Sequence, residues 1–211
     1  MPEPIATELP HRSTQSRFKR SLDIFGALIG LGLLTLLLGP VAIAIRLDSP
    51  GPIFYSQERY GLQGRPFRIW KFRSMVVDAD ALKATVQNQA QGLIFKNEAD
   101  PRITRIGKFL RKTSLDEFPQ FWNVLIGDMS LVGTRPPTGD EVLRYSDHHW
   151  QRLAVKPGLT GQWQISGRSA VKDFEEIVQL DLHYQERWTR LYDLRILLRT
   201  VYVLLTQPEA Y

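Results

Sequence analysis

The stretch that decides the fold of this chain is an uncharged apolar run, IFGALIGLGLLTLLLGPVAIAI, which extends from Ile24 to Ile45. About 20 apolar residues are enough for a helix to cross a bilayer. A signal peptide is excluded, because the run is too long, starts too late and is followed by no small-residue cleavage site. The run therefore predicts a membrane-embedded helix.

Basic residues flank the run on both sides. Arg12, Arg17, Lys19 and Arg20 precede it, and Arg46, Arg59, Arg65, Arg68, Lys71 and Arg73 follow it. Because positive charge marks cytoplasmic flanks, both ends are predicted to lie in the cytoplasm. A re-entrant hairpin over residues 17–46, broken at Gly39 and Pro40, meets that condition, since glycine lets the chain bend and proline removes a backbone donor. A single kinked span is the alternative.

Length and composition limit the remaining organisation. The 211 residues suffice for one domain and an anchor. Residues 1–16 are predicted to be a disordered tail, and residues 47–211 a cytoplasmic domain. The net charge of +5 and a pI near 9.6 favour anionic partners such as nucleotide phosphates, nucleic acid or acidic lipids. The absence of cysteine excludes disulfides and thiolate metal sites.

The domain after the run is predicted to combine a short β-hairpin with several helices. Strands are expected at residues 53–57 and 67–72, around the turn-forming segment 61–66. Helices are expected over residues 78–91, 105–110, 118–126, 174–184 and 190–205. The fold class is therefore α+β and mainly helical: a membrane helix-break-helix, a hairpin and amphipathic helices at the membrane interface.

The last predicted helix has two interpretations. Its leucine and valine side chains recur at helical spacing with arginines between them: Leu191, Leu194, Leu197, Leu198, Val201 and Leu205, with Arg190, Arg195 and Arg199. Such a pattern fits a helix packed in the core or one lying in the bilayer interface.

Two adjacent carboxylates, Asp116 and Glu117, stand in the basic segment RKTSLDEFPQ, residues 111–120. A nucleophilic carboxylate beside cations, on a membrane-anchored protein, suits phosphoryl-group chemistry at a lipid surface. The same residues also fit a capping box that merely starts a helix, with Ser114 as N-cap and Glu117 reaching back. Both interpretations place the dyad near a helix N-terminus.

Arg135 is the first candidate for phosphate binding outside the dyad. It lies between a glycine turn and Pro136-Pro137, which would hold its guanidinium in position for phosphate oxygens. An ordinary surface turn explains the same residues.

The loop KPGLTGQWQISGR, residues 156–168, is a second and weaker candidate. It contains Thr160, Gly161 and Arg168. Backbone donors in this loop could cradle phosphate, and Trp163 could stack on a base.

Metal-binding signals are sparse. Asp181, on a predicted helix, is either ion-paired, solvated or a metal ligand. His148 and His149 lack metal-ligand spacing to any other histidine, and the chain has no Walker loop, dinucleotide fingerprint, HExxH pattern or serine elbow.

Taken together, seven segments resemble, in order, those of the bacterial sugar transferases. These are the small monotopic polyprenyl-phosphate hexose-1-phosphate transferases of exopolysaccharide and glycan assembly. The segments are RSLDI (20–24), FYSQERYG (54–61), WKFRSM (70–75), SLDE (114–117), GDMS (127–130), RP (135–136) and KPGLTG (156–161). They cover residues 17 to about 205, which makes the resemblance far more specific than any one motif.

The resemblance implies transfer of sugar-1-phosphate from a UDP-sugar to polyprenyl phosphate, with release of UMP and Mg2+ as cofactor. In the family the first carboxylate of the dyad is the nucleophile, which corresponds to Asp116, and Glu117 supports it. Arg111 and Lys71 occupy positions of functional cations. Metal ligands are expected at Asp116 and Glu117, with Asp181 as a further candidate, and substrate contacts at Arg135, Pro136, Thr160, Gly161 and Arg168.

The resemblance also implies a place on the cytoplasmic face of the bacterial inner membrane, in a monotopic arrangement and without nucleic acid. This chain departs from the family at the break, typically Ser-Pro, where it has Gly39-Pro40, and at Thr134, where proline is frequent. The sugar stays open, as does the oligomeric state, a homodimer included. A membrane-anchored module that binds anionic lipid or nucleic acid without catalysis is the alternative function.

Overall fold

The computed structural model describes residues 10–167 and 171–206. The α-helices are α1 (Arg12–Gln15), α2 (Arg17–Asp48), α3 (Arg105–Lys112), α4 (Phe121–Ile126), α5 (Gly139–Val142), α6 (Asp147–Trp150), α7 (Gln162–Ile165), α8 (Phe174–Glu186) and α9 (Arg190–Thr206). Short 3-10 helices are η1 (Leu62–Gly64), η2 (Ala81–Thr85), η3 (Leu115–Gln120) and η4 (Gln151–Ala154). The strands are β1 (Phe54–Tyr60), β2 (Pro66–Phe72), β3 (Ser130–Val132) and β4 (Gly158–Thr160). The mixed, mainly helical class is as predicted.

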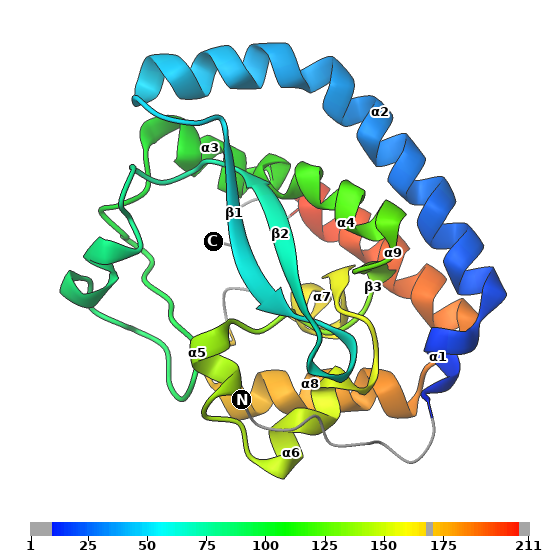
Figure 1. The fold of residues 1–211 in the computed structure, drawn as a ribbon. Helices are drawn as coiled ribbons and strands as arrows, with labels where there is room; N and C mark the ends of the chain where they lie inside the picture. Colours follow the sequence, from blue (N-terminus) through cyan, green and yellow to red (C-terminus); the bar gives the residue numbers. More distant parts are fainter. Residues whose placement is uncertain (1–9, 168–170, 207–211) are drawn as a thin grey trace.

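The apolar run forms the middle of α2, a 32-residue helix that arches over the rest of the molecule (Figure 1). Ser16 caps its start by accepting from the Lys19 amide. Pro40 lies inside the helix, so the predicted interruption at Gly39-Pro40 is wrong. Proline removes one hydrogen bond and bends a helix, but the turns on both sides of Pro40 continue here.

Both ends of α2 pack on the same domain, which accounts for the arch. Near its start, Leu22 and Ala27 join a core with Val124, Met129 and Leu131. Near its end, a separate cluster forms between the helix and the remaining chain: Val41 and Ile45 with Phe72 and Leu110. The close approach depends on Gly30, because a Cβ there would overlap the Phe121 ring.

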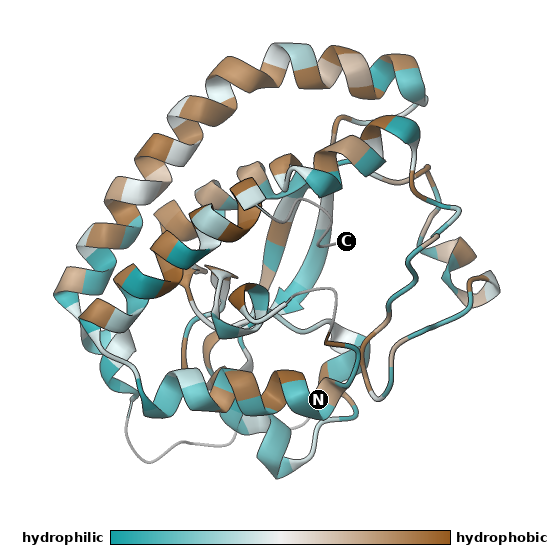
Figure 2. Ribbon diagram, turned by 180° about the vertical axis from the view of Figure 1, so that it is seen from behind, coloured by the Kyte–Doolittle hydropathy of each residue, from teal (hydrophilic) through white to brown (hydrophobic). Residues whose placement is uncertain are grey.

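The outer face of α2 is apolar and exposed. Phe25, Leu36 and Ile43 are 65%, 75% and 63% exposed, and Figure 2 shows that the arch is hydrophobic along most of its length. Within the described residues, α2 is the one helix long and apolar enough to cross a membrane.

The hairpin is as predicted, with longer strands. β1 and β2 pair antiparallel from Phe54↔Phe72 to Tyr60↔Pro66. At the turn, Gly64 takes a positive φ of 73°, and the Trp150 ring lies where a Cβ would stand. A second sheet pairs β3 with β4 in parallel.

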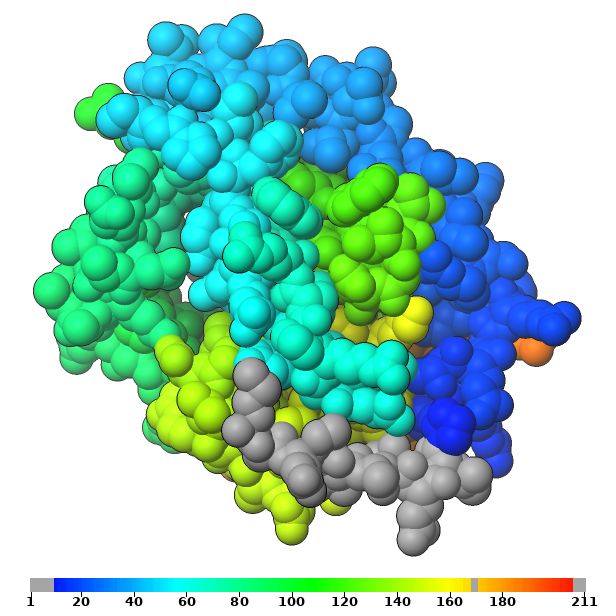
Figure 3. Space-filling model, in the orientation of Figure 1, coloured from blue at the N-terminus to red at the C-terminus, as the bar shows by residue number. Residues whose placement is uncertain are grey.

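The predicted helix over residues 78–91 is wrong, because only η2 forms there. The Asn88 side chain binds its own loop instead: Oδ1 accepts from the Ala90 and Lys96 amides, and Nδ2 donates to the Ile94 carbonyl. Such local side-chain bonds compete with helix formation. The resulting segment 76–104 borders a hollow beside the hairpin (Figure 3).

The predicted disorder of residues 1–16 is wrong from His11 onward, and residues 1–9 lie outside the described residues. α1 follows His11, whose ring accepts from the Ser13 amide and whose Nε2 lies 3.0 Å from the Gln185 carbonyl oxygen. The ring also meets Trp188 edge-on at 6.1 Å. These contacts to the C-terminal half hold the segment in place.

α9 packs in the core, as the first of its two interpretations predicted, and its position in the bilayer interface stays a prediction. Asp193, Ile196 and Val203 are buried, while Leu198 and Leu205 are 74% and 78% exposed. Asp193 fixes the helix through the Lys19 ammonium at 2.8 Å and the Tyr184 hydroxyl at 2.8 Å. One face thus belongs to the core, and the other presents an apolar surface.

Candidate active site

The dyad lies at the start of η3, directly after α3. Ser114 takes a left-handed φ of 55°, and its carbonyl accepts from the Glu117 amide. A capping residue has extended backbone instead, so the geometry is not that of a capping box. The sharp turn buries Asp116, which is 4% exposed, under the wall of a cavity.

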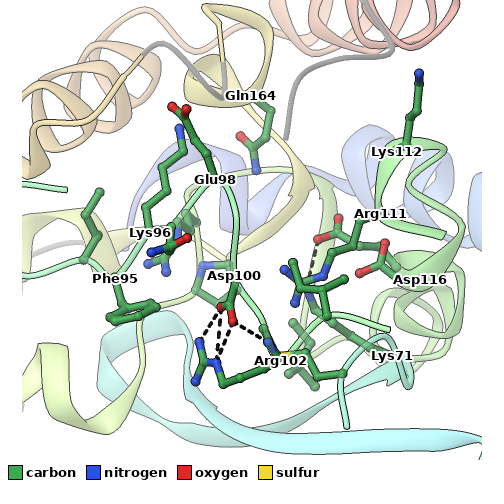
Figure 4. Close-up of a pocket in the computed structure, with 18 of the residues that line it drawn as sticks. Lys71, Phe95, Lys96, Glu98, Asp100, Arg102, Arg111, Lys112, Asp116 and Gln164 are labelled. Atoms are coloured by element: carbon green, nitrogen blue, oxygen red, sulfur yellow. Dashed lines mark hydrogen bonds and ion pairs between the residues drawn. The ribbon is translucent and has the colours of Figure 1, made fainter. Parts of the chain in front are cut away.

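Two cations from different elements converge on the dyad, as Figure 4 shows. Lys71, on β2, places its Nζ 3.0 Å from Glu117 Oε1. Arg111, on α3, is held by its Nε, which donates to Ser74 Oγ at 3.0 Å. β2, α3 and η3 thus bring two cations, Lys71 and Arg111, next to the two carboxylates of the dyad.

The cavity between these elements has a volume of about 940 Å³. Ligand sites typically measure about 300–1,000 Å³, so a nucleotide-sized molecule fits. Cations dominate the wall near the dyad: Lys71, Lys108, Arg111 and Lys112. The segment 94–103 forms the facing wall, and Asp100 and Arg102 fix its base through a 2.6 Å ion pair.

Arg135 also lines the cavity, as does Pro136. Its guanidinium forks onto Glu141, with Nη1 at 2.8 Å and Nη2 at 3.1 Å. Burial alone would lower the pKa of Arg135, but the charge and hydrogen bonds of Glu141 raise it overall. The same pair holds the pKa of Glu141 below its usual value in spite of its burial.

Arg59, which the sequence did not single out as a site residue, lies beside Arg135 in the cavity wall. Its Nη1 donates to the Pro136 carbonyl at 3.0 Å, and its Nη2 to Gln57 Oε1 at 2.8 Å. Burial and the neighbouring Arg135 lower the pKa of Arg59 to about 10. The available signal was strand alternation, because Gln57 and Arg59 share one face of β1.

Other predicted site residues are not brought to the cavity. Thr160 Oγ1 shares a 2.8 Å hydrogen bond with Thr200. Gly161 packs so closely that a Cβ would overlap the Gly133 carbonyl. Both therefore support the β3–β4 sheet behind the cavity wall. Arg168 lies outside the described residues.

Asp181 does not join the dyad. Its Oδ2 accepts from Arg152 Nε at 2.8 Å and Nη2 at 2.6 Å, and both side chains are buried. Burial raises the pKa of Asp181, and the Arg152 charge offsets only part of that rise. Among the described residues, no group of three or more histidine, cysteine or acidic side chains could hold a metal. The predicted grouping of Asp181 with Asp116 and Glu117 is therefore not found.

Two adjacent carboxylates still suit Mg2+. This ion is usually held by one or two carboxylates and completes its octahedron with water and substrate phosphates. Asp116 and Glu117 supply hard oxygen donors beside a cavity of sufficient size. The donor set thus fits Mg2+ without a third protein carboxylate.

The segments around this cavity match a known family model, that of the bacterial sugar transferases, over residues 14–207. The chain belongs to the bacterial sugar transferase family. The match includes the dyad, the hairpin, both cations and the whole of α2.

Several curated members are close in sequence. The galactosyl transferase CpsE of Streptococcus agalactiae is 56% identical over 193 residues, which are 89% of this chain and 42% of that protein. The undecaprenyl-phosphate galactose phosphotransferase of Salmonella typhimurium is 42% identical, over 98% of this chain and 44% of that protein. A UDP-glucose:undecaprenyl-phosphate glucose-1-phosphate transferase of Caulobacter vibrioides is 40% identical, over 92% and 72%. The chain spans less than half the length of the first two relatives.

Proposed function

We propose that this chain transfers sugar-1-phosphate from a UDP-sugar to polyprenyl phosphate, releasing UMP and forming polyprenyl-diphosphate-sugar. The observation that carries the proposal is the convergence of Lys71 and Arg111 on the Asp116-Glu117 dyad in one cavity. Family membership supports it, as do the relatives named for galactose or glucose transfer to undecaprenyl phosphate.

In the first step, a carboxylate oxygen of Asp116 attacks the phosphorus that carries the sugar. The bond from that phosphorus to the UMP oxygen breaks, and UMP leaves with the electron pair. An acyl-phosphate bearing the sugar remains on Asp116. A nucleophilic carboxylate that forms such an intermediate is established chemistry in proteins.

In the second step, an oxygen of the lipid phosphate attacks the same phosphorus. The acyl-phosphate bond breaks, which restores the Asp116 carboxylate and releases the lipid diphosphate sugar. The lipid phosphate is already an oxyanion, so no base is needed to activate it. The two half-reactions predict ping-pong kinetics.

The surrounding side chains compensate charge and hold geometry. Arg111 and Lys71 face the phosphoryl oxygens, where preorganised charge is most effective. Glu117 holds Lys71 through the 3.0 Å ion pair. Mg2+, held by Asp116 and Glu117, would supply further charge compensation on the phosphates. We assign contact with the diphosphate to Arg135, which Glu141 already holds in the cavity wall.

Exposed apolar surfaces around the cavity support a position at a membrane. α2 exposes an apolar face, as does α9, and Phe109 and Trp122 are 56% and 49% exposed on the elements that frame the dyad. We infer that the bent α2 enters and leaves on the cytoplasmic face, in a monotopic arrangement, because both of its ends pack on one domain. A soluble donor and a lipid phosphate then meet at the headgroup plane.

UMP release from a panel of UDP-sugars tests the proposal, with purified protein, Mg2+ and undecaprenyl phosphate. We expect release from one sugar, dependent on the lipid phosphate and abolished by Asp116→Asn. Asp140→Asn is the matched control, because the Asp140 side chain is 75% exposed on α5. Full turnover by Asp116→Asn would overturn the mechanism. No release from any sugar by folded protein in lipid would favour the binding-module alternative.

A further inference from the structure

The cavity has a second wall, formed by α7, which carries no cation that could bind a phosphate. α7 places Trp163 and Gln164 on it, and Figure 4 shows the Gln164 carboxamide directed into the cavity. Gln120, the last residue of η3, lines the same cavity from the dyad side. The proposed reaction has assigned these three side chains no role.

Each of the three carries a buried polar atom that has no hydrogen-bond partner among the described residues. The atoms are Gln120 Nε2, Trp163 Nε1 and Gln164 Oε1. Gln120 and Gln164 are only 3% and 9% exposed. Buried polar groups are nearly always paired in folded proteins, and each exception calls for an explanation. These three uncharged groups line one cavity, together with a further unpaired buried atom, Arg59 Nε, on the cationic wall. A ligand with both a neutral polar part and an anionic part would complete them.

The chemistry of these atoms selects a neutral polar ligand. Two are donors and one is an acceptor, and none of the side chains carries a charge. Phosphate needs cations, which Lys71, Arg111 and Arg135 already supply elsewhere in the cavity. A hexose suits the wall instead, because each of its hydroxyl groups can donate and accept a hydrogen bond.

The nucleobase is the other neutral part of the donor, and the cavity favours it less. A base binds best against a free aromatic face. The Trp163 ring packs on the cluster of Val171, Phe174 and Ile177, which leaves less of the ring free for the predicted stacking on a base. The Arg102 guanidinium lies over the Phe95 ring, 5.1 Å from its centroid, so one face of this second aromatic ring is also occupied.

The position of Gln120 relative to Asp116 also favours the hexose over the nucleobase. Gln120 follows Asp116 by four residues in the same 3-10 helix, little more than one turn along it, and both side chains line the cavity. In the proposed reaction the sugar is bonded to the phosphorus that Asp116 attacks. The hexose therefore lies within reach of the wall that begins at Gln120.

We propose that Gln120, Trp163 and Gln164 hydrogen-bond the hexose hydroxyl groups of the donor and set its sugar specificity. This inference rests on the proposed function, since it takes a UDP-hexose as the donor. It assigns to α7 a role in sugar recognition, separate from phosphate binding.

The test compares Gln164→Met and Gln120→Met with wild type, using the preferred UDP-hexose and its single-deoxy analogues. In wild type, removing the contacted hydroxyl should lower kcat/KM about tenfold, whereas in the variant the same removal should cost little. Gln162→Met is the matched control on α7, because its amide already bonds Ser166 Oγ at 3.1 Å and the Tyr192 hydroxyl at 2.8 Å. It should retain the full discrimination.

Thermal unfolding separates recognition from a structural role. Replacing an unpaired buried amide should leave the Tm of Gln164→Met unchanged or higher. A clear fall in Tm with unchanged sugar discrimination would overturn the proposal.

Binding by calorimetry separates the hexose from the nucleoside, using UDP-hexose and UMP as probes on Asp116→Asn protein. Gln164→Met in that background should weaken UDP-hexose about tenfold and leave UMP unchanged. Equal weakening of both would assign the wall to the nucleoside and overturn the hexose assignment. If wild type turns over and the variants discriminate as wild type does, only this inference fails. If neither probe binds and no sugar releases UMP, the proposed function fails with it.

Discussion

The Nζ of Lys71 lies 3.0 Å from Oε1 of Glu117, and this contact joins the β-hairpin to the dyad. Both side chains are partly exposed, 26% and 20%. Exposed ion pairs contribute only about 0–1 kcal/mol to stability. The pair therefore matters more for the site than for stability, because it holds a cation beside Glu117, the residue that follows the proposed nucleophile Asp116.

Lys71→Met should reduce turnover far more than stability. Loss of one preorganised group beside developing charge typically costs about 100-fold in kcat or more, whereas Tm should change little. UMP release and thermal unfolding measure the two effects. In a double-mutant cycle, Glu117→Gln should add less to Lys71→Met than it costs alone. Strictly additive losses would show that the two side chains act separately.

Glu141→Gln should destabilise the protein in a pH-dependent manner. It leaves the buried Arg135 without its counter-charge beside Arg59, and breaking such a pair costs about 3–5 kcal/mol. The folded-state pKa of Glu141 lies below the ordinary 4.5. Its stabilisation is thus present above pH 4.5 and is lost as pH falls through the folded pKa.

The measurement is Tm against pH for wild type and Glu141→Gln. The gap between the two curves should stay constant from neutral pH down to pH 5.5 and close below the ordinary glutamate range. Asp140→Asn, one residue away and exposed, should show almost no gap. A gap that widens on acidification would contradict the assigned direction of the Glu141 shift.

Two glycine substitutions should have opposite signs. A Cβ at Gly107 would overlap the Ser74 backbone carbonyl, so Gly107→Ala must push α3 away from the segment after β2, where Ser74 holds Arg111. At Gly39 nothing lies within 4 Å, and alanine should stabilise α2 by about 0.5–1 kcal/mol. Thermal unfolding in detergent checks both. A fall in Tm for Gly39→Ala would indicate that glycine is needed at the bend.

Local patterns predicted those elements whose residues are neighbours in sequence. Strand alternation gave the hairpin, and helical spacing gave α8 and α9, because each pattern reflects a single face. The predicted helix at 78–91 failed because the Asn88 side chain offers its backbone an alternative that periodicity does not register. The predicted break at Pro40 is wrong, because α2 continues through that residue and both of its ends pack on the domain.

The prediction of site residues succeeded and failed along the same line, between local motifs and contacts that only the fold creates. The dyad and its cations carried recognisable motifs, so the sequence alone singled out Asp116, Glu117, Lys71 and Arg111. Asp181 was misplaced, because its partner Arg152 lies 29 positions away and no spacing links them. Gln120 and Gln164 were missed for a related reason. A glutamine acquires significance only when burial leaves its amide unpaired, which requires the folded structure.

The topology of α2 can be tested by cysteine labelling, because the chain has no cysteine of its own. Gln15→Cys and Arg65→Cys place single thiols at exposed positions before and after the helix. Since both ends pack on one domain, a membrane-impermeant maleimide should label both in inside-out vesicles and neither in intact spheroplasts. Ile43→Cys, on the exposed apolar face, should react only after detergent is added. Labelling of Gln15→Cys and Arg65→Cys from opposite sides would establish a kinked span and overturn the monotopic arrangement.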